Sequence, residues 1–83
     1  MRTIWKFPLY GAVNDIEMPG EALVLCAHEQ DGESYLWVQV DPDNTAEFRR
    51  FEVVGIGNPV PSKYKGYIGT TFIDRYVWHV YEI

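Results

Sequence analysis

Short runs in which apolar and polar residues alternate, each closed by turn residues, dominate this sequence. The clearest example is residues 21–40, where two such runs flank the dipeptide Asp31-Gly32. A period of two places successive side chains on opposite faces of a strand, and Asp-Gly accepts the positive φ angles of a tight hairpin. The segment therefore predicts an antiparallel hairpin, with strands over residues 21–30 and 35–40 and a turn over residues 31–34.

The rest of the chain repeats this pattern and lacks the 3.6-residue stripe of an amphipathic helix. Further strands are predicted over residues 3–9, 15–18, 49–55, 64–73 and 76–83. The last two form a hairpin about Asp74-Arg75, and residues 45–48 form one helical turn. Six or seven short strands without a linker or repeat predict a single all-β domain over residues 1–83. Its small antiparallel sheet is expected to roll into a barrel or sandwich.

The faces of the predicted strands differ in character. In the middle hairpin one face is purely aliphatic and is expected to form the core: Leu23, Leu25, Ala27, Leu36, Val38 and Val40. The other face is mixed and is expected to be a contact surface: Val24, Cys26, His28, Tyr35, Trp37 and Gln39. In the last hairpin, one face is expected to hold Ile68, Thr70, Phe72, Val77, His79 and Tyr81, and the other Gly69, Thr71, Trp78 and Val80. Gly69, opposite Val80, leaves room beside Trp78 for a ring or for close approach of a backbone.

Aromatic residues are unusually frequent for so short a chain. It is 47% hydrophobic and holds three Trp, six Tyr and four Phe, which is more ring surface than one small core can enclose. Two apolar faces therefore predict a homo-oligomer, with Tyr35, Trp37, Trp78 and His28 as candidate interface residues.

Charge and cysteine content exclude several classes of protein. A net charge of −5 argues against direct DNA binding, because nucleic-acid binding needs a basic face. Cys26 is the only cysteine, so no intrachain disulfide can form and a cytoplasmic location is expected. No apolar run suits a signal peptide or a membrane span.

No residue set predicts catalysis or a metal site, so no cofactor and no enzymatic activity are expected. Cys26 and His28 project to the same side of a strand, but nothing supplies the third, orienting group of a nucleophilic site. These two residues and His79 are too few for a structural zinc site. Asp41, Asp43 and Asn44 fit an Asx turn better than a calcium loop.

One local cluster could bind an anionic ligand. Arg49, Arg50, Lys63 and Lys65 flank the glycine- and proline-rich loop of residues 55–61, close to Tyr64 and Tyr67. Stacking and charge together suit a small anionic nucleotide. Ordinary surface charge is the competing interpretation.

Several blocks of the chain resemble a large family of small proteins encoded by bacteriophages and prophages, classed as a domain of unknown function. They are Met-Arg-Thr-Ile-Trp-Lys-Phe-Pro-Leu over residues 1–9, Ile-Glu-Met-Pro over 16–19, Leu-Trp over 36–37, Val-Asp-Pro over 40–42, Gly-Ile-Gly-Asn-Pro-Val-Pro over 55–61, Tyr-Ile-Gly-Thr over 67–70 and Val-Trp-His-Val-Tyr-Glu over 77–82. The resemblance implies a phage gene product in the bacterial cytoplasm. It supplies no catalytic residues.

These observations leave several functions open. The favoured one is a non-enzymatic phage protein that counters host defence by sequestering a nucleotide immune signal. The alternatives are a protein inhibitor of a CRISPR or restriction complex, and a minor virion protein.

Overall fold

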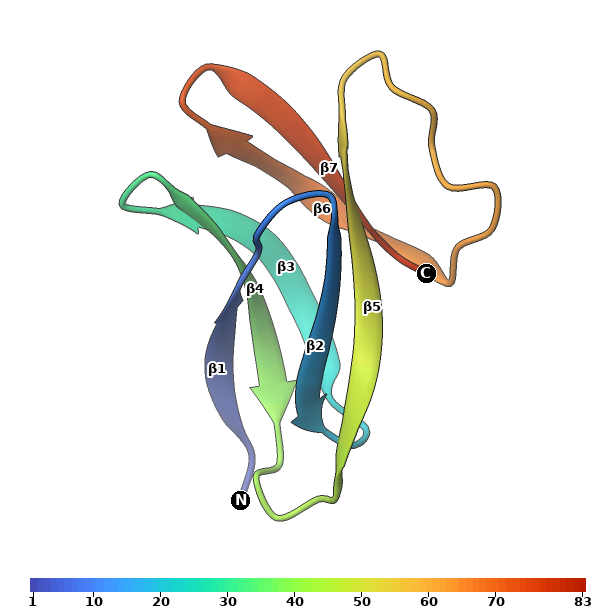
Figure 1. Ribbon diagram of the computed structural model, residues 1–83. Coiled ribbons are helices and arrows are strands. Elements are labelled where there is room, and N and C mark those ends of the chain that lie inside the picture. Colours follow the sequence, from blue (N-terminus) through green and yellow to red (C-terminus); the bar gives the residue numbers. More distant parts are fainter.

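The computed structural model describes residues 1–83 and contains seven strands and no helix (Figure 1). The strands are β1 (Thr3–Pro8), β2 (Val13–Pro19), β3 (Leu23–Gln30), β4 (Glu33–Val40), β5 (Ala46–Gly55), β6 (Gly66–Ile73) and β7 (Tyr76–Glu82). No helix is therefore available to span a membrane. The predicted all-β class is confirmed.

The strands form two antiparallel sheets that pack face to face. One has the order β1-β4-β3 and the other the order β2-β5-β7-β6. The sheets do not close into a barrel, so the sandwich is the correct one of the two predicted packings. Consecutive strands pair in only two places, the β3–β4 and β6–β7 hairpins, while β1 pairs with β4 and β2 with β5.

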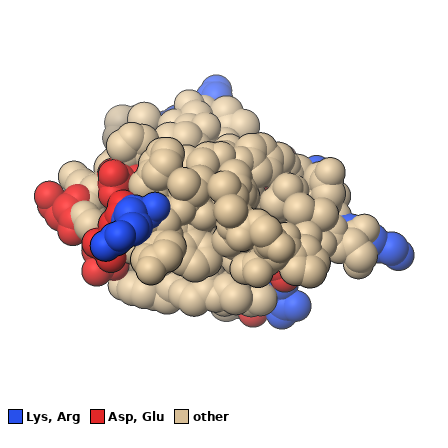
Figure 2. Space-filling view, turned by 90° about the horizontal axis from the view of Figure 1, so that it is seen from above, with Lys and Arg blue, Asp and Glu red and all other residues tan.

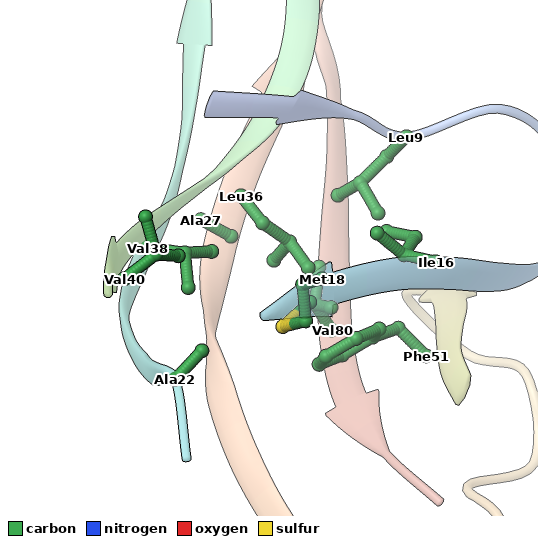
Figure 3. Packing of buried hydrophobic residues seen from close by; sticks show 10 residues of the cluster. All are labelled: Leu9, Ile16, Met18, Ala22, Ala27, Leu36, Val38, Val40, Phe51 and Val80. Atoms are coloured by element: carbon green, nitrogen blue, oxygen red, sulfur yellow. The ribbon is translucent and has the colours of Figure 1, made fainter. Parts of the chain in front are cut away.

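A single cluster of apolar side chains fills the space between the inner faces (Figure 3). Its members are Leu9, Ile16, Met18, Ala22, Ala27, Leu36, Val38, Val40, Phe51 and Val80. Both sheets contribute, and Phe51 and Leu36 are completely buried. Because each strand sends alternate residues inward, the aliphatic positions of β4 and the Phe51 ring of β5 enter the same cluster from opposite sheets.

Both predicted hairpin turns are present. Asp31 and Gly32 have φ angles of 53° and 80°, which match a two-residue turn with both central residues left-handed. Asp74 has a φ of 55° at the second turn. The first turn is shorter than predicted, because Gln30 pairs directly with Glu33.

The predicted helical turn over residues 45–48 is wrong. Ala46 begins β5, and Ala46, Glu47 and Phe48 pair with Pro19, Met18 and Glu17 of β2. Local composition favoured a helix there, but pairing with β2 extends the strand instead.

Two residues assigned to the core lie outside it. Leu23 and Leu25 are 56% and 45% exposed, because a β-bulge between Val24 and Cys26 reverses the alternation of faces. Val24, assigned to the contact face, packs against the core instead. After the bulge Ala27 faces the core, as predicted.

A second bulge changes the last hairpin. It lies between Tyr67 and Gly69, so Tyr67 rather than Ile68 pairs with Tyr81, and Ile68 packs against the core. Gly69 does pair with Val80. A Cβ atom on Gly69 would lie 3.7 Å from the backbone nitrogen of Ala27, so the backbone of β3 approaches this position.

Candidate functional site

The two arginines predicted to bind a ligand point to opposite faces of β5. Arg49 faces inward, where its Nε and Nη2 atoms donate to the Glu82 carboxylate at 2.7 and 2.8 Å. Its Nη1 atom donates to the carbonyl of Ala22 at 2.7 Å, and its guanidinium lies over the Phe51 ring. Arg49 therefore seals one end of the core.

These contacts alter the ionisation of both partners. Hydrogen bonds from Arg49 lower the pKa of Glu82, and the same bonds raise the pKa of Arg49. The two side chains are only 18% and 12% exposed.

Arg50 occupies the outer face and donates to Asp15 at 2.7 and 3.2 Å. Its hydrogen bonds lower the pKa of the Asp15 carboxyl. Both side chains are more than half exposed, so water surrounds this pair. The predicted group of four cations is thus divided. Of the four, Lys63 and Lys65 make no ion pair.

The predicted tyrosines lie in an aromatic cluster on the outer face of β6 and β7. The Tyr81 ring has edge-to-face contacts with Tyr64 at 4.9 Å and with Tyr67 at 5.1 Å, measured between ring centroids. Tyr67 lies beside His79, with its hydroxyl 3.0 Å from His79 Nδ1, and also contacts the Thr70 hydroxyl. We call Tyr64, Tyr67, His79 and Tyr81 the aromatic row.

A shallow depression of about 460 Å³ separates the aromatic row from the loop that follows β5. Its lining residues are Val54, Gly55, Ile56, Gly57, Asn58, Val60, Tyr67, His79 and Tyr81. The loop turns sharply at its start, since the Asn58 amide donates to the Gly55 carbonyl at 3.1 Å and Gly57 has a φ of 84°. The glycine-rich segment thus follows directly on the end of β5 and forms one wall of the depression.

The residues predicted to form an interface do not share one surface. Tyr35, Trp37 and His28 lie on the outer face of the three-stranded sheet, and the rings of Tyr35 and Trp37 meet at 6.3 Å. The Lys6 ammonium lies over the Tyr35 ring at 4.6 Å. Trp78 instead points between the sheets, because it pairs with Thr71, which is buried on the inner face.

Trp78 lines a cleft at the end of the sandwich that is uppermost in Figure 1. This cleft has a volume of about 330 Å³ and also borders Leu9, Val53 and Ile73. Figure 2 looks down on this end, where charged side chains gather at the margin of a largely uncharged surface. The buried Nε1 atom of Trp78 has no hydrogen-bond partner. The sequence did not predict this cleft, because the size of the cleft depends on the distance between the two sheets.

The three residues considered for a metal site are divided between the sheets, with Cys26 and His28 on β3 and His79 on β7. Cys26 and His28 are exposed on the outer face of β3, and His28 Nδ1 donates to the Glu29 carbonyl at 2.7 Å. No group of three or more His, Cys, Asp or Glu side chains is placed to hold a metal ion. The Asp43 amide donates to Asp41 Oδ1 at 3.1 Å, which confirms the predicted Asx turn.

Comparison with known proteins identifies the family alone. Neither a curated protein nor a solved structure matches the chain. The model of one family matches residues 1–83, which is the whole length of the sequence. The chain therefore belongs to the family described as a domain of unknown function, DUF7352.

Proposed function

We propose that this protein is a non-enzymatic binding protein that holds a planar ring, of the nucleobase or nucleotide class, against the aromatic row. The supporting observation is the geometry of Tyr67, His79 and Tyr81, which line one depression together with a glycine-containing loop. Stacking on aromatic side chains contributes about 1–3 kcal/mol per base and tolerates different bases.

The charge available for an anionic ligand is smaller than the sequence indicated. Arg49 and Arg50 are engaged by Glu82 and Asp15, which leaves Lys63 and Lys65 near the row. Tyr67, Thr70 and His79 add hydroxyl and imidazole groups that can hydrogen-bond to a ligand edge. Stacking is therefore the larger contribution, and the lysines supplement it.

Sequestration of a nucleotide signal in a bacterial host fits such a site, because a binder of this kind needs no catalytic group. In this proposal the protein is a phage product that counters a host defence. The resemblance of its opening and closing segments to phage-encoded proteins supports that origin.

Calorimetric titration with ADP-ribose and with cyclic dinucleotides tests the proposal. Wild-type protein is expected to bind one of these probes saturably and to melt at a higher temperature with it. Tyr67→Ala is expected to weaken binding about tenfold or more. Tyr10→Ala, which removes a 68% exposed tyrosine outside the row, serves as the matched control and keeps affinity unchanged. Absence of any melting shift with all probes overturns the proposal.

The outer face of the three-stranded sheet favours a second candidate function, inhibition of a host protein complex. Ile4 and Leu23 are 58% and 56% exposed there, beside the Tyr35–Trp37 pair. Co-purification of a defined CRISPR or restriction subunit with wild-type protein, and its loss with Leu23→Glu, supports this function. Equal recovery with both proteins argues against it.

A further inference from the structure

The cleft at the end of the sandwich that is uppermost in Figure 1 differs in chemistry from the depression beside the aromatic row. Its walls come from both sheets, with Ser34 on β4 and with Val53, Ile73 and Trp78 on β5, β6 and β7. No lysine, arginine, aspartate or glutamate lines it. Because burial of an unpaired ion is costly, the cleft disfavours phosphates and carboxylates and suits an uncharged ligand.

The polar side chains of the cleft leave one donor free. The Ser34 hydroxyl is already hydrogen-bonded to the Thr71 hydroxyl at 3.1 Å, and Asn58 is exposed to water. Trp78 Nε1 is buried, and no protein group accepts its hydrogen. A buried donor without an acceptor reduces stability by the cost of its lost hydration. A ligand that brings an acceptor to this N–H therefore removes that cost when it binds.

The packing of the indole indicates how the donor is reached. Gly55 lies under the Cε3–Cζ3 edge of the Trp78 ring, since a Cβ atom on Gly55 would lie 3.5 and 3.1 Å from those two atoms. Nε1 belongs to the opposite edge of the indole, which faces away from Gly55. The N–H is covered in the free protein, but no hydrogen bond holds it there. A small turn of the ring therefore brings it to an acceptor in the cleft, and the hydrogen bond gained offsets the turn.

We propose that the cleft binds a small, uncharged molecule, of about two fused rings, whose carbonyl oxygen accepts a hydrogen bond from Trp78 Nε1. Its volume is about 330 Å³, compared with the roughly 150 Å³ of a protein cavity that binds benzene. The apolar walls cover the rings, and the single polar contact fixes their orientation, which is the usual division of labour in a small-molecule site. Aryl ketones, quinones and lactones belong to this class.

Indanone and indane form a matched pair of probes, because they share two fused rings and only the ketone carries an acceptor. Indanone is expected to bind saturably and about tenfold tighter than indane. Two-dimensional nitrogen–proton NMR reports the contact directly, since the chain has only three indole N–H groups. Indanone is expected to move the Trp78 indole signal downfield and to leave those of Trp5 and Trp37 in place.

Four variants locate the site. Trp78→Phe keeps a ring in the wall and removes the donor, so indanone should lose its advantage over indane. Ala12→Phe places a ring at the exposed margin of the cleft and should weaken indanone binding about tenfold. Ala46→Phe makes the same change at an exposed position outside the cleft and is the matched control. Tyr67→Ala alters the aromatic row alone and should keep indanone affinity, so this cleft and the nucleotide site are tested separately.

Circular dichroism establishes that each variant is folded, and the signal lost in Trp78→Phe identifies the Trp78 indole. If that variant does not fold, Trp5→Phe and Trp37→Phe identify the signal by elimination. Failure of indanone to bind up to its solubility limit overturns the proposal. So does binding that leaves the Trp78 signal unmoved, equal affinity of wild-type protein for the two probes, or a preference for indanone that persists in folded Trp78→Phe.

Discussion

The two ends of the sandwich are closed in different ways. At one end Arg49 joins Glu82, Ala22 and the Phe51 ring, so a charged pair with several hydrogen bonds covers the core. At the other end Trp78 borders an uncharged cleft, and its indole N–H has no partner. Polar groups with specific partners fix a geometry, whereas apolar contacts at an open end tolerate several. We expect the first end to determine stability and the second to tolerate change.

The largest effect is expected at the closed end. Arg49→Ala leaves the Glu82 carboxylate and the Ala22 carbonyl without their donor, which should lower the free energy of unfolding by roughly 2 to 3 kcal/mol. Urea denaturation measures the loss. Combining Arg49→Met with Glu82→Gln removes both charges and should recover part of it. A double variant less stable than either single variant contradicts this interpretation.

Low pH should reduce the stability that the Arg49–Glu82 pair contributes at the same end of the sandwich. Because Arg49 holds the pKa of Glu82 below its ordinary value, the folded state favours the ionised carboxylate. The resulting stability is complete above the unfolded pKa and disappears as pH falls through the folded pKa. Wild-type protein should therefore lose stability below about pH 4.5, with a steeper decline than Glu82→Gln. Melting temperatures measured across this pH range check the prediction. If wild-type protein and Glu82→Gln lose stability equally as pH falls, the Arg49–Glu82 pair is not the cause.

A smaller effect is expected at the open end, where Gly55 lies under the indole of Trp78. A Cβ atom there would sit 3.1 Å from both Trp78 Cζ3 and Asn58 Nδ2, so both side chains must shift. Gly55→Ala should cost about 1 kcal/mol in thermal unfolding, which is at the low end for overpacking. Gly66→Ala meets no atom within 4 Å and is the matched control. Equal stability of Gly55→Ala and Gly66→Ala would contradict this prediction, because Trp78 and Asn58 would then move aside without a loss of stability.

The smallest effect is expected from the neighbour of Arg49. Arg50 makes a similar ion pair with Asp15, but in water. Arg50→Ala should leave the urea midpoint within the error of the measurement, because exposed ion pairs contribute little. A loss comparable with that of Arg49→Ala would remove the distinction between buried and exposed pairs.

Sequence patterns predicted the parts of the fold that depend on local chemistry. Asp31-Gly32 and Asp74 mark real turns, and the alternation in β4 identifies Leu36, Val38 and Val40 as core. The patterns failed where one inserted residue changes the alternation, at the bulges after Val24 and Tyr67. A bulge depends on the partner strand, which local sequence does not specify.

The candidate site was predicted only in part for a related reason. The predicted Tyr64 and Tyr67 both contact the ring of Tyr81, and His79 lies beside Tyr67 across the β6–β7 hairpin. The charges of Arg49 and Arg50 looked available because their partners, Glu82 and Asp15, are distant in the sequence. Long-range pairing of strands decides which charges remain free.

The order of strand pairing has a consequence for the protein while it is being made. β1 and β2 have no partner among the residues that precede them and must wait for β4 and β5. At a synthesis rate of about 5–20 residues per second, that interval lasts roughly two to eight seconds. Trp5 and Phe7 remain open to chaperones on the ribosome during this time, whereas the β3–β4 hairpin can close as soon as it emerges.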